Sequence, residues 1–189
     1  MMIIGITGTI GAGKGTIVEF LKKKKNFKHF SVRGFISEEI KKRGMPVNRD
    51  SMVVVANDLR AKNSPSYIVD RLFEKAREAG GNSVIESIRT PGEVESLMEK
   101  GNFRLFAVDC DPVIRFNRIK ARASETDHVD FETFMENEKR EMETDDPNKQ
   151  NLKKCIEMAD YVFDNSGLVE ELYAEVEKVL GEIGGRSED

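Results

Sequence analysis

The chain of 189 residues has only two cysteines, Cys110 and Cys155, and they lie far apart without Cys-x-x-Cys spacing. This scarcity argues against a zinc site and against a disulfide scaffold. We expect two buried free thiols, with a single disulfide as the alternative. The chain also lacks a run of about 20 apolar residues, the length that crosses a bilayer. Its first residues lack the basic start and apolar stretch of a secretion signal. The expectation is a cytoplasmic protein without a membrane partner.

Neither sign of charge dominates, since 30 Lys and Arg residues face 34 Asp and Glu residues, for a formal net charge of −4. This balance predicts no general attraction to nucleic acid or to anionic membranes. Any phosphate-binding site must then be a local concentration of lysine and arginine. The length fits a single domain, residues 1–189, because single cores grow to roughly 250–300 residues before chains split.

Short apolar runs alternate with helical patterns along the chain, which predicts an α/β fold with a mainly parallel sheet. We expect five strands, at residues 2–7, 29–32, 83–86, 103–109 and 161–164. We expect helices between and after them, at residues 14–25, 35–43, 51–62, 65–79, 91–100, 111–122, 131–143 and 168–180.

A glycine-rich loop joins the first predicted strand to the first predicted helix. Backbone N–H groups in such a loop, together with the helix N-terminus, form an anion site. Lys14 is placed to reach the outer phosphates of a bound nucleotide. Gly15 separates Lys14 from Thr16, so the strict G-x-x-x-x-G-K-[ST] pattern is not met, and an incidental glycine turn is the alternative. The residues predicted to bind phosphate are Gly8, Gly11, Ala12, Gly13, Lys14, Gly15 and Thr16.

The Gly-x-Gly-Lys-Gly-Thr form resembles that of adenylate kinases and their relatives, the nucleoside-monophosphate-kinase branch of P-loop proteins. The segment 84–90, Val-Ile-Glu-Ser-Ile-Arg-Thr, is similar to the strand-Asp-Gly-x-Pro-Arg segment of those kinases. The resemblance implies a three-layer fold with about five parallel strands, helices on both faces, and ATP and Mg²⁺ as cofactors. It implies that Thr16 and, through water, Glu86 support the Mg²⁺ ion, and that Arg89 holds the phosphate of the acceptor.

Two later segments extend the resemblance. In the helix that follows the fourth predicted strand, Arg118 and Arg122 match two arginines at the base of the lid, which contact ATP and the transferring phosphate. Lys14, Glu86, Arg118 and Arg122 are therefore the catalytic candidates. Residues 159–167 resemble the last strand and loop of dephospho-CoA kinases, where the loop lies against adenine. This assigns Ser166 and Gly167 to ATP binding.

The acceptor side departs from the families that the chain resembles. Ser37 stands where adenylate kinases have an arginine, and the Asp-x-Asp element of dephospho-CoA kinases is missing. The insert at residues 33–79 supplies other cations, of which Arg60 and Arg33 are the candidates for acceptor binding beside Arg89. A solvated helix arginine is the alternative for Arg60. The whole pattern looks closest to an archaeal-type group related to dephospho-CoA kinase.

A short polar lid is predicted at residues 123–151. Lys139 and Arg140 on its helix are candidates to reach the phosphates when the lid closes, with a solvated face as the alternative. His128 is a candidate general base, and a surface histidine is the competing interpretation.

Together these features predict an ATP-dependent phosphotransferase that acts on a small nucleotide-like acceptor, a nucleoside or deoxynucleoside monophosphate. The alternatives are a dephospho-CoA kinase activity, a nucleotide-binding switch or sensor, and a kinase-like adaptor without turnover. The predicted partner is the small-molecule acceptor, and the predicted assembly is a monomer or a homodimer.

Overall fold

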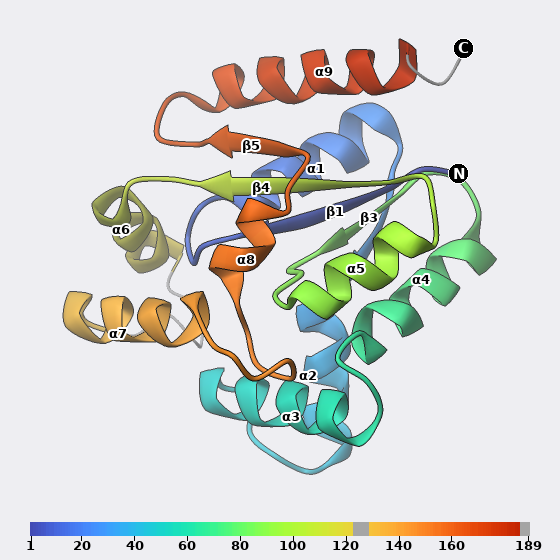
Figure 1. Ribbon diagram of the computed structural model, residues 1–189. Coiled ribbons are helices and arrows are strands. Elements are labelled where there is room, and N and C mark those ends of the chain that lie inside the picture. The colour runs from blue at the N-terminus through green and yellow to red at the C-terminus, as the bar shows by residue number, and fades with distance from the viewer. Residues whose placement is uncertain (123–128, 186–189) are drawn as a thin grey trace.

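The computed structural model describes residues 1–122 and 129–185, and its centre is a parallel sheet of five strands in the order β2-β3-β1-β4-β5 (Figure 1). The strands are β1 (Ile3–Gly8), β2 (Lys28–Ser31), β3 (Ser83–Glu86), β4 (Phe103–Asp109) and β5 (Tyr161–Asp164). Because β1 is central, it has a parallel neighbour on each side: Ile6 is level with Glu86 of β3 and with Phe106 of β4.

Helices cover both faces of the sheet, as the sequence predicts. On one face lie α1 (Lys14–Lys25) and α9 (Val169–Gly185), and the other face is covered by α2 (Val32–Lys42), α3 (Arg49–Lys62), α4 (Tyr67–Ala79), α5 (Pro91–Glu99) and α8 (Leu152–Glu157). Two further helices, α6 (Pro112–Arg122) and α7 (Phe131–Met142), lie near the carboxyl ends of the strands (Figure 1).

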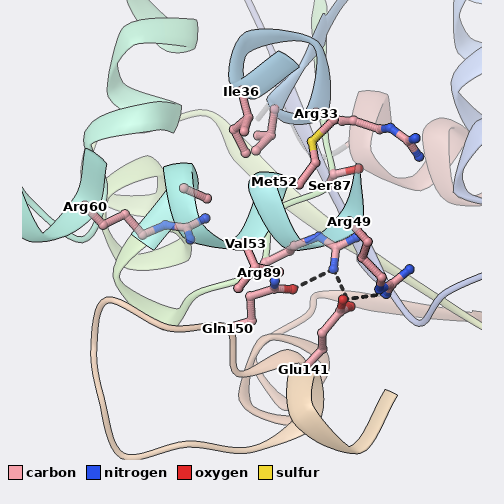
Figure 2. A pocket seen from close by; sticks show the side chains of 12 residues that line it. Arg33, Ile36, Arg49, Met52, Val53, Arg60, Ser87, Arg89, Glu141 and Gln150 are labelled. Carbon is pink, nitrogen blue, oxygen red and sulfur yellow. Dashed lines mark hydrogen bonds and ion pairs between the residues drawn. The ribbon is translucent and has the colours of Figure 1, made fainter. Parts of the chain in front are cut away.

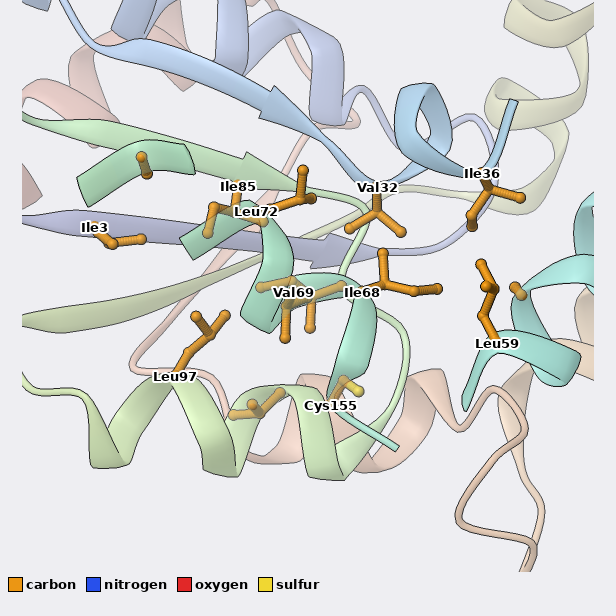
Figure 3. Packing of buried hydrophobic residues seen from close by; sticks show 14 of the residues in the cluster. Ile3, Val32, Ile36, Leu59, Ile68, Val69, Leu72, Ile85, Leu97 and Cys155 are labelled. Carbon is orange, nitrogen blue, oxygen red and sulfur yellow. The ribbon is translucent and has the colours of Figure 1, made fainter. Parts of the chain in front are cut away.

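The core follows from the two-residue period of the strands. Ile3 points into the cluster beneath α2–α5, whereas Ile4 and Ile6 point into the cluster beneath α1 and α9. Figure 3 shows the first cluster, where Ile3 and Ile85 of the sheet meet side chains of the covering helices. Both faces of β1 are apolar because both are buried, as is usual for parallel sheets.

The five predicted strands and eight predicted helices are confirmed, with end points that differ by a few residues. The largest difference is at α9, which ends at Gly185 rather than at residue 180. β2 ends at Ser31 rather than at residue 32, so that α2 begins at once instead of at residue 35. Ser31 acts both as the last strand residue and as the N-cap, since its Oγ accepts a hydrogen bond from the Gly34 N–H at 3.1 Å. Such side-chain capping is favourable for serine.

The sequence did not predict α8, which has only six residues. Its cap is nevertheless visible in the sequence, because the side chain of Asn151 accepts a hydrogen bond from the Lys154 N–H. Cys155 on this helix and Cys110 after β4 are buried free thiols, as predicted. Among the described helices, none combines the length and the apolar character needed to cross a membrane.

Candidate active site

The glycine-rich loop runs from the end of β1 to the start of α1, with Gly13 as the helix N-cap in a left-handed conformation. Gly8 has a φ of 141° and Gly13 a φ of 96°, a region that glycine enters without steric cost. A Cβ atom on Gly8 would lie 2.1 Å from the carbonyl oxygen of Val108. These positions therefore require glycine, and the loop can turn tightly between strand and helix, as the phosphate-binding prediction assumes.

Three neighbouring segments hold this loop in place. The Thr9 hydroxyl donates to Asp109 Oδ1 at 2.7 Å, at the end of β4. Arg115 of α6 donates from Nη1 to the Ile10 carbonyl at 3.2 Å. Asn165, just after β5, donates from Nδ2 to the Ala12 carbonyl at 2.8 Å. The loop is thus fixed by side chains from more than 90 residues away, which favours a preorganised anion site over an incidental turn.

Lys14 is the first residue of α1, and its side chain points back along the loop. Its Nζ donates to the carbonyl oxygens of Gly8 at 2.8 Å and Thr9 at 2.7 Å. Burial, and then the charge of Arg89, lower the pKa of Lys14 to about 7. Because burial is the main cause of this shift and the charge of Arg89 the second, an anion bound beside Lys14 would raise its pKa again.

A cleft of about 500 Å³ opens beside the loop, at the carboxyl ends of β1 and β3. Open α/β sheets bind ligands at this edge. Its lining includes one carboxylate, Glu86, and six cationic side chains: Lys14, Arg33, Arg49, Arg89, Arg118 and Arg122. In a chain with a net charge of −4, this is the local concentration of positive charge that a phosphate site needs.

Glu86 lies at the end of β3, where Ser31 of the neighbouring strand β2 is its direct partner. The Ser31 hydroxyl donates to Glu86 Oε1 at 3.0 Å, and His29 Nε2 lies 3.5 Å from the same oxygen. Burial acts to raise the pKa of Glu86, but contacts with His29 and Ser31 and the charge of Lys14 outweigh it, so the pKa lies below its usual value. An ionised carboxylate and the Thr16 hydroxyl in one cleft are oxygen ligands of the kind that suit Mg²⁺.

Two arginines of α6 reach the cleft from its other side. Arg118 and Arg122 both line it, and the buried Ile119 between them packs with Ile10 and Phe134. Arg118 Nη1 also lies 3.4 Å from the Sγ atom of Cys110. The spacing of four residues therefore brings both guanidinium groups to the same cleft, and their catalytic roles stay predictions.

A smaller pocket of about 80 Å³ adjoins the cleft (Figure 2). One part of its wall is apolar, made by Val32, Ile36, Met52, Val53 and Ala56, and the other part is polar, made by Arg33, Arg49, Arg60, Ser87, Arg89, Glu141 and Gln150. Arg33, Arg49, Ser87 and Arg89 line both cavities. The pocket and the cleft therefore share one wall.

Arg60 has a larger structural role than the sequence predicts. It lines the small pocket, yet its side chain is only 1% exposed and its Nη2 atom lies 2.8 Å from Oε1 of Glu93, which is fully buried. The other oxygen of Glu93 accepts hydrogen bonds from the backbone N–H groups of Arg89 and Thr90. Arg60 thus supports the segment that carries Arg89. A direct contact between Arg60 and an acceptor stays a prediction.

Ser166 and Gly167 lie in an exposed turn after β5, where the Ser166 hydroxyl donates to Asp164 Oδ1 at 2.6 Å. They are not among the described residues that line the cleft. Their neighbour Asn165 is the residue of this motif that touches the phosphate loop. Adenine binding by Ser166 and Gly167 stays a prediction.

The described part of the predicted lid consists of α7 and the segment that leads to α8, and His128 lies outside the described residues. Phe134 is buried against Ile10 and Ile119, and Glu138 pairs with Arg115. Lys139 is exposed, and Arg140 lies on the surface 3.7 Å from Asp50. Neither Lys139 nor Arg140 lines the cleft, and Glu141 is the described α7 residue that lines the small pocket.

Four residues at the site were not assigned a role from the sequence: Arg49, Ser87, Glu141 and Gln150. Ser87 has a φ of 70°, uncommon for a residue with a side chain, and such strain concentrates at functional sites. Arg49 directly follows the N-cap Asn48, which fixes it at the start of α3. No short sequence motif marks Glu141, because its partners Arg49 and Arg89 lie 92 and 52 residues away in the sequence.

Comparisons with known proteins show the family and the fold of the chain. Residues 4–146 match the family described as AAA domain. A UPF0200 protein of Thermococcus kodakarensis is 31% identical over 188 residues, which cover 96% of this chain and 98% of the relative. A UPF0200 protein of Methanocaldococcus jannaschii is 30% identical over 191 residues, with 97% of this chain and 91% of the relative covered.

Among solved structures, a shikimate kinase from Bacteroides thetaiotaomicron aligns with a TM-score of 0.55 at 15% identity, over 95% of this chain and 98% of that one. A gluconokinase from Sinorhizobium meliloti aligns with a TM-score of 0.53 at 13% identity, over 92% and 88% of the two chains. At such identities the likeness shows the fold alone, which is that of P-loop kinases. The match over residues 4–146 and the full-length relatives show that the chain belongs to the UPF0200 family, within the AAA domain group of P-loop proteins.

Proposed function

We propose that this protein transfers the γ-phosphate of ATP to a small anionic acceptor, and that a nucleoside or deoxynucleoside monophosphate is the acceptor. The observation that carries the proposal is the shared wall of the two cavities. The nucleotide cleft and the small pocket have Arg33, Arg49, Ser87 and Arg89 in common. A donor in one cavity and an acceptor in the other would meet at this wall.

The roles follow from the chemistry of phosphoryl transfer, which depends mainly on alignment and on neutralising charge. Lys14 and the loop N–H groups bind the ATP phosphates. Thr16 and, through water, Glu86 support Mg²⁺. Arg118 and Arg122 stabilise charge on the transferring group, and Arg89 holds the acceptor.

The acceptor decides whether a base is needed. If the attacking oxygen belongs to a phosphate, it is already ionised and no base is required. If it belongs to a hydroxyl group, we propose Glu86 as the base, since it is the carboxylate among the described residues that line the cleft. Water must be excluded in either case, because it would otherwise compete as the attacking group.

A panel assay tests the proposal. Purified protein is incubated with ATP and Mg²⁺ and with each nucleoside or deoxynucleoside monophosphate in turn, and ADP formation is measured. Dephospho-CoA belongs in the same panel as the alternative acceptor. We expect one acceptor to raise ADP formation well above the rate without acceptor. ATP binding without acceptor-dependent turnover would instead support a sensor or an adaptor.

A further inference from the structure

Glu141, near the end of α7, is a carboxylate buried between two arginines. Its side chain is 3% exposed. Oε1 lies 2.5 Å from Nη2 of Arg49 on α3, and Oε2 lies 2.5 Å from Nη1 of Arg89 after β3. Figure 2 shows this arrangement, with Gln150 also bonded to Arg89. The lid helix thus places an anion on the arginine wall that the two cavities share.

Burial acts to raise the pKa of Glu141, but the charges of Arg89 and Arg49 outweigh it and keep the pKa below its usual value. A buried carboxylate is costly unless it is paired. Here two arginines pair with one carboxylate, so the cluster keeps an excess of positive charge. The site could therefore accept an anion with more charge than a single carboxylate.

The pocket also has more hydrogen-bond donors than Glu141 can satisfy. Arg49 Nε and Arg60 Nη1 are both buried and have no hydrogen-bond partner in the described part of the chain. Both residues line the small pocket. Buried donors without partners are rare in proteins. A phosphate group offers three terminal oxygens and a charge of about −1.5 to −2, which suits these donors better than the two oxygens of a carboxylate.

We propose that Glu141 is an internal stand-in for a phosphate monoester of the acceptor, which displaces it from Arg49 and Arg89 on binding. This inference rests on the proposed function and adds a specificity-determining residue to it. An acceptor without an anionic group could not displace Glu141 from the two arginines. Glu141 therefore selects against uncharged acceptors.

The exchange also affects the lid. Glu141 forms ion pairs that connect the C-terminal turn of α7 to Arg49 of α3 and to Arg89. Glu138 connects the preceding turn of α7 to Arg115 by another ion pair. Displacement of Glu141 frees only the end of the helix, next to the shared wall. The nearby pair of Arg140 and Asp50 is exposed and spans 3.7 Å, so it adds little restraint.

Inorganic phosphate is a probe that tests the exchange without any reaction. The glycine-rich loop at residues 8–16 is first saturated with Mg²⁺ and a non-hydrolysable ATP analogue. Added phosphate can then bind only at the arginines that the two cavities share. Phosphate affinity is then measured by the rise in melting temperature. We expect Glu141→Gln to bind phosphate at least tenfold more tightly than the wild-type protein, because the internal competitor has lost its charge.

Glu138→Gln is the matched control, since it removes a carboxylate from a buried arginine one turn earlier on the same helix. It should not gain phosphate affinity. An equal gain in both variants would mean a general response to an unpaired arginine and would contradict the proposal. No gain in Glu141→Gln would contradict it directly. A larger gain for acetate than for phosphate would overturn the phosphate assignment.

Arg49→Gln provides a second variant if Glu141→Gln does not fold. It leaves Arg89 paired with Glu141 and removes the excess positive charge that would attract phosphate. We expect this variant to bind phosphate at least tenfold more weakly than the wild-type protein, and unchanged binding would overturn the proposal. The same titrations without the ATP analogue remain informative if the protein does not bind ATP. Failure of the proposed function and failure of the exchange are therefore distinguishable.

Discussion

Arg60 and Glu93 form a buried ion pair, with Arg60 Nη2 2.8 Å from Glu93 Oε1 and the two side chains 1% and 0% exposed. Glu93 is also the third residue of α5 and accepts the backbone N–H of Arg89 at 2.8 Å. The pair therefore connects α3 to the segment that carries Arg89. Its position suggests that it sets the geometry of the acceptor side as well as the stability of the fold.

Arg60→Met should destabilise the protein, because it leaves the Glu93 carboxylate buried without its partner. Breaking a buried pair from one side costs about 3–5 kcal/mol. The measurement is the free energy of unfolding in urea. Arg43→Met is the control, since the pair of Arg43 and Asp58 is solvent-exposed and its loss should change the free energy of unfolding much less. Equal losses in the two variants would contradict the structural role of Arg60.

Gly13→Ala should lower stability, because a Cβ there would lie 2.0 Å from Asn165 Nδ2 and the φ of 96° disfavours a side chain. Backbone strain of this kind costs about 1–3 kcal/mol. Gly15→Ala is the control: its Cβ would meet nothing within 4 Å, and it lies inside α1. There alanine should raise stability by about 0.4–1 kcal/mol. The melting temperatures of the two variants measure the difference. A Gly13→Ala protein as stable as Gly15→Ala would contradict the described loop geometry.

Lys14 should take up a proton when nucleotide binds. Its pKa is about 7 in the free protein, and a triphosphate would raise it. At pH 8 the uptake should approach about 0.9 proton per nucleotide, and at pH 6 it should be close to zero. Calorimetric titrations in buffers of different ionisation enthalpy measure it. Uptake that persists in Lys14→Met would assign the proton to another group.

The same shift gives a pH dependence of stability in the absence of nucleotide. The unfolded chain keeps the Lys14 proton up to a pKa of 10.5, whereas the folded protein releases it near 7. Between these values the unfolded state binds more protons, so the contribution of Lys14 to the free energy of unfolding rises with pH. Below pH 7 Lys14 is protonated in both the folded and the unfolded state, so its destabilising effect on the folded protein is at its maximum and no longer changes with pH.

Arg118→Ala should lower turnover more than it lowers ATP affinity, because we assign its charge to the transition state rather than to ground-state binding. Steady-state kinetics with the acceptor found in the panel, together with direct ATP titration, separate the two effects. Lys120→Ala is a matched control, since Lys120 is an exposed cation on the same helix. Equal loss of affinity with unchanged turnover would indicate a simple binding role for Arg118.

The fold was predictable because its signals are local. The central strands β1 and β4 are short apolar runs, and the glycines of the loop stand close together, at positions 8, 11, 13 and 15. The boundary at Ser31 was misplaced because one residue ends β2 and also caps α2. Helix α8 was missed because six residues do not show a helical period.

Prediction of the site divides in the same way. The sequence brought Lys14, Glu86 and Arg89 to attention through motifs beside strand ends, and the structure brings all three to one cleft. The roles of Arg49 and Glu141 depend on a contact across 92 residues, which single-sequence patterns do not contain. Arg60 was predicted as an acceptor-binding residue, and its buried pairing with Glu93 was missed because Glu93 lies 33 residues away in the sequence.

The central claim is that the loop at residues 8–16 binds a nucleoside triphosphate and that Lys14 contributes to its grip. The most direct measurement is the dissociation constant for ATP with Mg²⁺, determined by calorimetry for the wild-type protein and for a folded Lys14→Met variant. We expect the wild-type protein to bind and the variant to bind at least ~100-fold more weakly, about 2.7 kcal/mol in free energy. A wild-type protein that ignores both ATP and GTP, or a variant that binds as tightly as the wild type, would contradict the account.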